Sequence, residues 1–455
     1  IEAGQAYVDE QSANAIRAGR GTLTQPGQNS PFRDRPSTKS LQLFKEMREG
    51  RHPDGSLVLR AKIDMASPNM NMRDPVLYRI RHAHHHRTGN TWCIYPLYDF
   101  AHPLSDAIEG ISHSICTLEF EDHRPLYNWL VERLAEAGHF NKAQLPHQYE
   151  FARLNLTYVV LSKRKLIELV EMGVVTGWDD PRMPSLVAAR RRGYTPEGFR
   201  QFVEQSGVSK SDGWIDYTVL EDCMRNHLNE VAPRRVAVLD PLKLVIENLD
   251  PDEVIDCEAP NHPQKPELGR RAMPMTRELY IEHEDFMVEP SKGFFRLQPG
   301  GRVRLKYGFV AEYVSHSVGE NGRVADVRVS IFKDSQSGTP GADSYKVKGV
   351  IHWVSASQAH WAEVRLFDRL FKVAAPGARR EGDAPELERD FKDDLNPNSL
   401  QVVRVPMEPS LKDAQAEDRF QFERHGYFVA DRLDARPGQP VFNRTVTLKD
   451  SWAKA

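Results

Sequence analysis

The sequence is poor in the features that stabilise secreted or metal-bound proteins. Its four cysteines, Cys93, Cys116, Cys223 and Cys257, lie far apart and form no Cys-x-x-Cys pair. This spacing argues against a disulfide framework and against a structural zinc site, and it indicates reduced thiols in the cytoplasm. No apolar run is long enough to span a bilayer, so we expect no membrane partner.

Neither charge sign dominates the chain. Lys and Arg number 61 and Asp and Glu number 64, which gives a net charge of -3 at pH 7. Binding of nucleic acid would therefore depend on local basic faces and not on overall charge. The apolar fraction of 40% is enough for real cores, and the chain length predicts about three or four domains.

The sequence also lacks an initiator methionine and a signal peptide. It opens on Ile1-Glu2-Ala3-Gly4, which we interpret as the interior of a helix. We therefore expect that further residues precede this chain in the whole protein.

Hydrophobic periodicity divides the chain into segments of different character. It predicts helices over 40–48 and 126–134, a strand over 57–65 and a parallel α/β unit over 92–120. Thr195-Pro196-Glu197 is a typical helix start. Residues 155–232 are rich in helix, whereas short alternating runs beyond Ala232 predict antiparallel β-barrels. The expected class is a multidomain α/β protein with all-β domains in its C-terminal part.

A short basic motif, Ser162-Lys163-Arg164-Lys165, is the strongest candidate for chemistry. Taken alone, such a tetrapeptide is usually a solvated helix end. Its context is more specific, because Arg153 to Lys165 resembles the ATP-binding end of class I aminoacyl-tRNA synthetases, in the form found in glutaminyl-tRNA synthetases. In a nucleotidyl transfer of this kind, cations and backbone donors stabilise the charge that develops on a phosphate.

The resemblance to glutaminyl-tRNA synthetases extends over the whole chain. It is carried by segments 61–68, 72–76, 93–100, 105–114 and 177–184, and by segments 442–446 and 451–454. It implies an acceptor-stem-binding α+β insert over 1–97, the second half of a Rossmann-type domain over 98–154, and a helical subdomain over 155–232 that starts with the Ser-Lys-Arg-Lys loop. Residues 233–265 with 365–455 would form a proximal anticodon-binding β-barrel, and residues 266–364 a distal one.

The resemblance assigns ATP to two stretches of the chain. Lys163 and Ser162 would act in catalysis, with Lys163 supplying a cation on a mobile loop. The ATP-binding set would be Thr117, Arg153, Leu154, Leu161, Ser162 and Lys163. ATP would bring Mg²⁺, for which no dedicated protein cage is visible, as is usual for this ion. Without the resemblance, Arg153 would be interpreted as a solvated helix-start arginine.

The resemblance also implies a binding site for the substrate glutamine. Tyr98 would hydrogen-bond the amino acid, and the residues lining the same region would be His102, Cys116, Phe120 and Gln148. A neutral amide both donates and accepts hydrogen bonds, so a site of hydroxyl groups and ordered water can pair with it and match glutamate poorly. On sequence grounds alone, Tyr98 and His102 would instead be core-edge residues at a strand-to-helix turn.

Contacts with tRNA are the third implication of the resemblance. Leu23, at the tip of a turn-rich loop, would act as an apolar wedge at the first acceptor pair, although an ordinary loop leucine is the simpler alternative. Arg302, Arg304 and Lys306 alternate with apolar residues, which places the three cations on one face of a strand; such a face is usually only solvated. The implied tRNA-binding set is Leu23, Asp122, Ser209, Lys210, Trp214, Arg234, Arg296, Arg304, Gln421 and Arg424.

A run of histidines, His82, His84, His85 and His86, invites a metal-site interpretation. Adjacent residues point in different directions on a helix or a strand, so they cannot easily chelate one ion. We expect a polar or RNA-facing strand end here, with no zinc and no other protein-bound metal.

One motif that class I synthetases require is missing. No His-x-Gly-His spacing, which would hold the ATP phosphates, occurs in the chain. We therefore predict that the chain as written forms no aminoacyl-adenylate and is the larger C-terminal portion of a monomeric, cytoplasmic enzyme that joins L-glutamine to tRNA-Gln. Two alternatives stay open: a glutamyl-tRNA synthetase of the archaeal and eukaryotic type, and an inactive tRNA-binding fragment.

Overall fold

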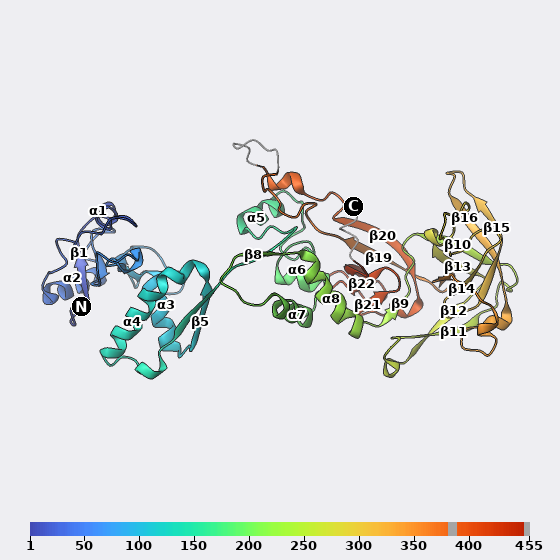
Figure 1. The fold of residues 1–455 in the computed structure, drawn as a ribbon, viewed down its shortest axis with the longest axis horizontal. Helices are drawn as coiled ribbons and strands as arrows, with labels where there is room; N and C mark the ends of the chain where they lie inside the picture. The colour runs from blue at the N-terminus through green and yellow to red at the C-terminus, as the bar shows by residue number, and fades with distance from the viewer. Residues whose placement is uncertain (381–388, 450–455) are drawn as a thin grey trace. The chain divides into compact units, whose positions relative to one another are not determined.

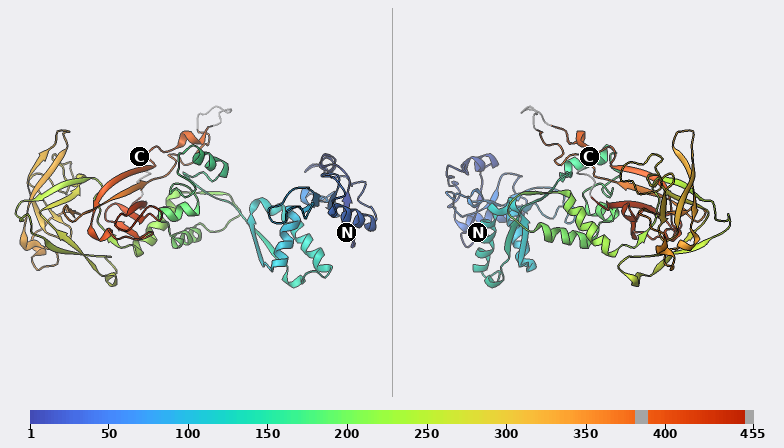
Figure 2. Two further views of the ribbon diagram at one scale, coloured as in Figure 1. Left: turned by 180° about the vertical axis from the view of Figure 1, so that it is seen from behind. Right: turned by 45° about the vertical axis from the view of Figure 1, so that its right-hand side comes forward.

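The computed structural model describes residues 1–380 and 389–449, so the segment 451–454 lies outside the described residues. The chain forms two compact units (Figures 1 and 2). The first consists of residues 1–154 and 208–213, and the second of residues 155–207 and 214–455. Among the described residues, no helix has the length and apolar character needed to cross a membrane.

The first unit begins with a small antiparallel sheet. Its strand order is β1 (Ala6–Asp9), β2 (Val58–Ala61), β3 (Val76–Ile80) and β4 (Ile94–Pro96), with helices α1 (Ala13–Gly19) and α2 (Ser37–Arg48). Leu43 and Met47 of α2 pack with Val8 and Leu59 of the sheet. The expectation that Ile1 to Gly4 lie inside a helix is wrong, because these residues form a turn that leads into β1.

A parallel α/β unit completes the first compact unit. It runs through α3 (Tyr98–Glu109), β5 (His113–Thr117), a 3-10 helix η2 (Leu118–His123), α4 (Arg124–Glu136) and β6 (His147–Phe151). Strands β5 and β6 pair in parallel, as predicted for this region. Helices α3 and α4 lie beside this strand pair in Figure 1.

The second unit starts with four helices. They are α5 (Lys163–Glu171), α6 (Leu186–Arg192), α7 (Pro196–Ser206) and α8 (Tyr217–Val231), and the short strands β7 (Leu154–Leu156) and β8 (Gly213–Ile215) mark where the chain passes between the units. The predicted helix start at Thr195 is confirmed, because its hydroxyl accepts from the amide of Gly198 at 3.1 Å. The predicted Ser-Lys-Arg-Lys loop is instead the beginning of α5, since Leu166 and Leu169 give this segment a buried apolar side.

Two curled sheets form the rest of the second unit. The six-stranded sheet has the order β20 (Leu400–Met407), β19 (His360–Phe367), β23 (Val441–Thr447), β22 (Gly426–Ala430), β21 (Arg419–Phe422) and β9 (Arg234–Arg235). The seven-stranded sheet has the order β17 (Val350–Ile351), β14 (Arg302–Leu305), β15 (Val310–Val318), β16 (Val324–Ile331), β10 (Pro241–Ile246), β13 (Glu278–Glu282) and β18 (Val354–Ser355). A hairpin of β11 (Ile255–Pro260) and β12 (Arg270–Met275) stands beside it.

These sheets correct the prediction of purely antiparallel barrels. In the described residues the end strands of each sheet are not paired with each other, so the sheets are open. Each sheet also contains parallel pairs, namely β10 with β16, β14 with β17, β19 with β23, and β9 with β21. Alternating apolar residues reveal a strand but not the direction of its neighbour, which is why the sequence could not predict this mixture.

Helices α6, α7 and α8 pack directly on the six-stranded sheet. Tyr194, Phe202 and Met224 form one apolar cluster with Tyr427 and Val446 of that sheet. The seven-stranded sheet has its own large core, which includes Trp353. Residues 155–207 and 214–232 therefore lie in the same compact unit as the six-stranded sheet, and their separation as a helical subdomain stays a prediction.

Candidate active site and nucleic-acid contacts

The predicted glutamine-binding residues gather around the start of α3. The ring of Tyr98 lies 5.3 Å from the ring of His102 and 5.3 Å from that of Phe120. Gln148 on β6 donates from Nε2 to the carbonyl of Phe120 at 3.0 Å. Cys116 lies close enough to Tyr98 to raise the pKa of its hydroxyl, so these side chains lie near one another.

The register of β5 and β6 explains why these residues come together. Ser114 pairs with Gln148, and Cys116 with Glu150. Residues two apart on a strand share a face, so this face carries the polar side chains. The opposite face carries Ile115 and the stacked rings of His113 and Tyr149, which are exposed.

A network that the sequence reasoning missed fixes His102. The Nε2 atom of His102 lies 3.0 Å from the Ser114 hydroxyl and 3.0 Å from the Asp106 carboxylate. The hydroxyls of Ser114 and Tyr127 donate to the same Asp106 oxygen at 2.6 Å and 2.8 Å. The four-residue spacing of His102 and Asp106 on a helix was the only signal of this contact in the sequence.

Burial and nearby charges shift the pKa values of two residues in this cluster. Burial raises the pKa values of Tyr98 and Cys116, and Asp106 raises both further. Glu150 also raises the pKa of Cys116, while Arg124 opposes this shift. Glu150 lies 3.4 Å from Arg124 and 3.2 Å from Lys210, so both cations face an anion of the protein.

The predicted ATP residues are divided between the two units. Thr117, Arg153 and Leu154 belong to the first unit, where the Thr117 hydroxyl donates to Glu119 at 2.9 Å. Leu161, Ser162 and Lys163 belong to the second unit. Ser162 is the N-cap of α5, and its hydroxyl makes no capping hydrogen bond. Lys163 is exposed and forms no salt bridge with the described residues, so an anion could approach both it and the free amides of the first turn.

The loop that carries Leu23 is held by hydrogen bonds from one buried side chain. The buried guanidinium of Arg73 donates to the main-chain carbonyls of Arg20, Thr22 and Gln25 at 2.7, 2.9 and 3.0 Å. Leu23 itself is 81% exposed at the tip. An apolar side chain is thus presented to solvent on a firmly supported loop, as a wedge requires.

The other predicted contacts of the first unit differ in their surroundings. Asp122 is exposed, and its carbonyl accepts from Asn69 at 2.7 Å and from Asn71 at 3.2 Å. Lys210 is held by Glu121 at 2.6 Å and by Glu150. Ser209 accepts a main-chain hydrogen bond from Ala152 at 2.8 Å, and Trp214, in the second unit, is largely exposed.

Several of the residues predicted to contact the anticodon donate hydrogen bonds to other groups of the protein. Arg234 is buried and donates to Ala232 at 2.6 Å and to the Asn229 side chain at 2.8 Å. Arg304 donates to the carbonyls of Ser335 and Ala342. Gln421 donates to Tyr427 at 2.9 Å. The alternation along β14 is confirmed, because Val303 and Leu305 are buried while Arg302 and Arg304 are not. Their contact with RNA stays a prediction.

Arg296 and Arg424 converge on one pair of carboxylates. Arg424 holds Asp285 through two contacts of 2.6 and 2.8 Å and reaches Glu284 at 3.0 Å. Arg296 lies 2.9 Å from Glu284 and 3.4 Å from Asp285. Burial lowers the pKa of Arg424, but Asp285 together with Glu284 and Glu282 outweighs burial, so the net shift of the pKa is upward. Both guanidiniums therefore have fixed positions.

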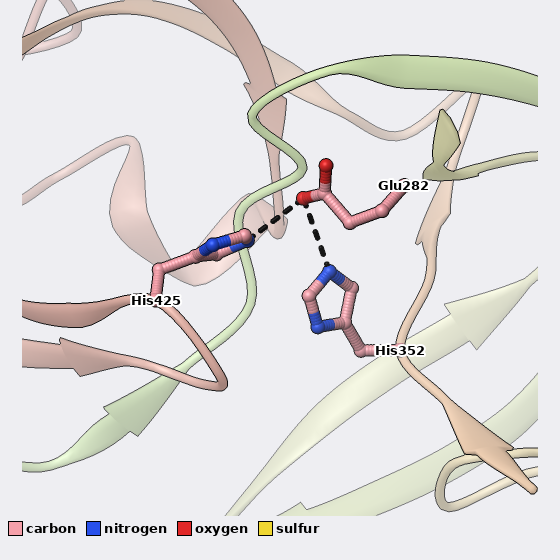
Figure 3. A group of neighbouring side chains, drawn as sticks. All are labelled: Glu282, His352 and His425. Carbon is pink, nitrogen blue, oxygen red and sulfur yellow. Dashed lines mark hydrogen bonds and ion pairs between the residues drawn. The ribbon is translucent and has the colours of Figure 1, made fainter. Parts of the chain in front are cut away.

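The group of Glu282, His352 and the partly exposed His425 is the only cluster in the described part of the chain with metal-ligand composition (Figure 3). Both imidazole Nε2 atoms face the same Glu282 oxygen, at 3.3 Å for His352 and 2.7 Å for His425. That oxygen also accepts from the Leu239 amide at 2.7 Å. The Nδ1 atom of His352 is buried without a hydrogen-bond partner, whereas a metal-bound imidazole normally donates from that atom. A hydrogen-bonded cluster accounts for this geometry better than a metal site.

Family models cover most of the chain. Residues 1–230 match the catalytic domain of "tRNA synthetases class I (E and Q)". Residues 232–331 and 350–431 match two models of the anti-codon binding domain of the same family. The chain belongs to this family of class I tRNA synthetases.

Curated relatives narrow the family to its glutamine branch. The chain is 60% identical over 454 residues to a glutamine–tRNA ligase of Cupriavidus taiwanensis. The aligned region covers 100% of this chain and 76% of that protein. It is 60% identical to the enzyme of Ralstonia pickettii, of which it covers 77%, and 59% identical to that of Bordetella pertussis, of which it covers 76%. The chain thus spans about three quarters of the length of these ligases, and it belongs with enzymes that are aminoacyl-tRNA ligases.

Proposed function

We propose that the protein joins L-glutamine to tRNA-Gln in two steps. The glutamine carboxylate attacks the α-phosphate of ATP, which forms glutaminyl-AMP and releases pyrophosphate. The terminal ribose hydroxyl of tRNA then attacks the acyl carbon and displaces AMP. The proposal is supported by the identity with glutamine–tRNA ligases and by the cluster around Tyr98.

The cluster around Tyr98 carries the proposal for the amino acid. Tyr98, His102 and Gln148 supply a hydroxyl, an imidazole and an amide around Phe120. An amide side chain finds both donors and acceptors in such a set, whereas a carboxylate, which only accepts, would leave the acceptors of the set without a partner. The site therefore suits glutamine better than glutamate.

The first turn of α5 supplies the proposed ATP contacts. Lys163 would pair with the phosphates of ATP, and the free amides behind Ser162 would add donors of the helix terminus. These groups would stabilise the charge that develops as pyrophosphate departs. Mg²⁺ would accompany the ATP phosphates and would neutralise part of their charge. Thr117, Arg153, Leu154 and Leu161 complete the proposed ATP set.

Specificity for glutamate is the nearest alternative. It would call for a cation beside Tyr98, but the nearby cations Arg124 and Lys210 already pair with Glu150. Pure tRNA binding is the other alternative, and it gives no reason for an exposed Lys163 at an uncapped helix start. Contacts with the acceptor stem and anticodon, a monomeric state and a cytoplasmic location remain part of the proposal.

Replacement of Lys163 by alanine tests the proposed ATP contact in the complete product of the gene. The kcat/KM for ATP in aminoacylation should fall by about 100-fold or more, while the melting temperature should not change, because the side chain is exposed. Arg164→Ala is the matched control, since Arg164 is the next exposed cation of α5. Equal activity of the two variants would show that the Lys163 side chain does not contact ATP.

A further inference from the structure

One turn of the six-stranded sheet is anchored in the seven-stranded sheet by three consecutive side chains. The turn consists of Glu423, Arg424 and His425, between β21 and β22. Glu423 accepts from Tyr307 at 2.7 Å and pairs with Lys306, both of which follow β14. Arg424 and His425 continue the contact through the carboxylates described above. We refer to residues 423–425 as the anchored turn.

The acceptors of the anchored turn are themselves rigid. Asp285 is fully buried, and its main-chain carbonyl accepts from Leu297 at 3.0 Å. Glu282, at the end of β13, is held by the amides of Leu239 and Asp240 at 2.7 and 2.9 Å, and by His352. Figure 3 shows the Glu282 side chain between the two imidazoles. Carboxylates fixed in this way can orient whatever cation they bind.

The backbone of the anchored turn also depends on these contacts. Arg424 has a φ angle of 70°, a left-handed conformation that is unfavourable for a residue with a side chain. Such a conformation persists where surrounding contacts hold it, and it often occurs at binding sites. The ion pair with Asp285 and the adjacent contact of His425 with Glu282 provide that support.

Both guanidiniums keep an open side. The side chain of Arg424 is 27% exposed and that of Arg296 is 37% exposed, although each pairs with Asp285 and Glu284. A guanidinium bound along one edge still offers its flat face and its other N–H groups to an unstacked base. Because the orientation is already fixed, little side-chain freedom would be lost on binding.

We propose that Asp285 and Glu282 are positioning residues for tRNA recognition. Asp285 orients Arg424 and Arg296 directly, and Glu282 orients Arg424 through the neighbouring His425. Together they present two guanidiniums to unpaired bases of the anticodon loop. This proposal rests on the proposed function, because it takes tRNA as the ligand.

Steady-state aminoacylation of tRNA-Gln by the complete gene product separates this role from simple stabilisation. In Asp285→Asn, the KM for tRNA should rise by about 10-fold or more, while kcat should fall by less than about threefold. The penalty for substituted anticodon bases should also shrink, because misplaced guanidiniums discriminate poorly. Glu253→Gln, which breaks the partly exposed pair with Lys333 outside the strands, should leave all of these values unchanged.

A second pair of variants covers the case in which Asp285→Asn does not fold. His425→Ala should raise the KM for tRNA by about three- to tenfold, and His425→Gln should restore it, because glutamine retains an N–H donor for Glu282. A lowered melting temperature with unchanged tRNA KM and anticodon discrimination would overturn the proposal. Absence of charging by the unsubstituted protein would instead refute the proposed function.

Discussion

The guanidinium of Arg73 donates to the main-chain carbonyl of Thr22 at 2.9 Å, immediately before the exposed Leu23. The same group serves the carbonyls on both sides of the loop, so one buried side chain supports its whole tip. A rigid loop can push an apolar side chain against a base pair without yielding itself. The wedge role proposed for Leu23 thus depends on Arg73.

Replacement of Arg73 by methionine should loosen this loop. Methionine fills similar space but cannot donate, so several carbonyls lose their partner and the first unit should lose about 2–4 kcal/mol of stability. Proteolysis within residues 21–27 should become faster. The exposed Arg17→Met is the control, and equal proteolysis of the two variants would contradict the supporting role of Arg73.

Replacement of Leu23 by alanine should impair charging without destabilising the protein. The side chain is exposed, so little burial is lost on folding. With normal tRNA, kcat/KM should fall by about tenfold, because unstacking the first acceptor pair costs a few kcal/mol. With a tRNA whose first pair is mismatched, the loss should vanish. Val208→Ala, another exposed apolar position in this unit, should affect neither substrate.

Replacement of Tyr98 by phenylalanine should weaken selection of the amino acid. The ring contacts with His102 and Phe120 remain, but the hydroxyl is lost. We expect kcat/KM for glutamine to fall by about 10- to 100-fold, with a smaller change for glutamate. Initial rates at saturating ATP and tRNA measure both. Tyr149→Phe, on the opposite face of the strand pair, should match the unsubstituted protein; an unaffected Tyr98→Phe enzyme would exclude the hydroxyl from the site.

The environment of His352 predicts a pH dependence of stability. Burial lowers the pKa of His352, and Arg424 and His425 lower it further, while Glu282 opposes them. The folded state therefore keeps a neutral imidazole that the unfolded chain protonates below its ordinary pKa of about 6.5. The neutral His352 therefore contributes to the free energy of unfolding above about pH 6.5, and this contribution is lost as the pH falls below that value.

A His352→Gln variant isolates that effect. Glutamine retains an N–H donor for Glu282 but does not titrate. Between pH 7.5 and 5, the unsubstituted protein should lose about 1–2 kcal/mol more stability than the variant, seen as a steeper fall of its melting temperature. Parallel curves for the two proteins would show that His352 is not held neutral.

Local patterns predicted local structure well. Thr195 and Pro196 marked the start of α7 because capping chemistry acts within one helical turn. The helix over 40–48 appears within α2, from Ser37 to Arg48. The resemblance predicts a loop at Lys163, but the apolar positions Leu166 and Leu169 that follow it make the segment the first turn of a helix.

Contacts between distant segments could not be predicted in the same way. Glu282 lies 70 residues from His352 and 143 residues from His425 in the sequence, and no spacing rule connects them. Likewise, nothing in the sequence showed that Asp285 would bind Arg424, or that Asp106 would hold His102 together with Ser114 and Tyr127. These networks depend on strand order and register, which only the folded chain determines.

The most direct test of the proposed ligase activity is aminoacylation of total tRNA by the complete gene product, with glutamine and glutamate offered in parallel. We expect stable aminoacylation of tRNA with glutamine alone, at a rate that depends on Tyr98 and Lys163. Charging with glutamate would contradict the amide-selective site, and tight tRNA binding without any charging would contradict the proposed ligase activity.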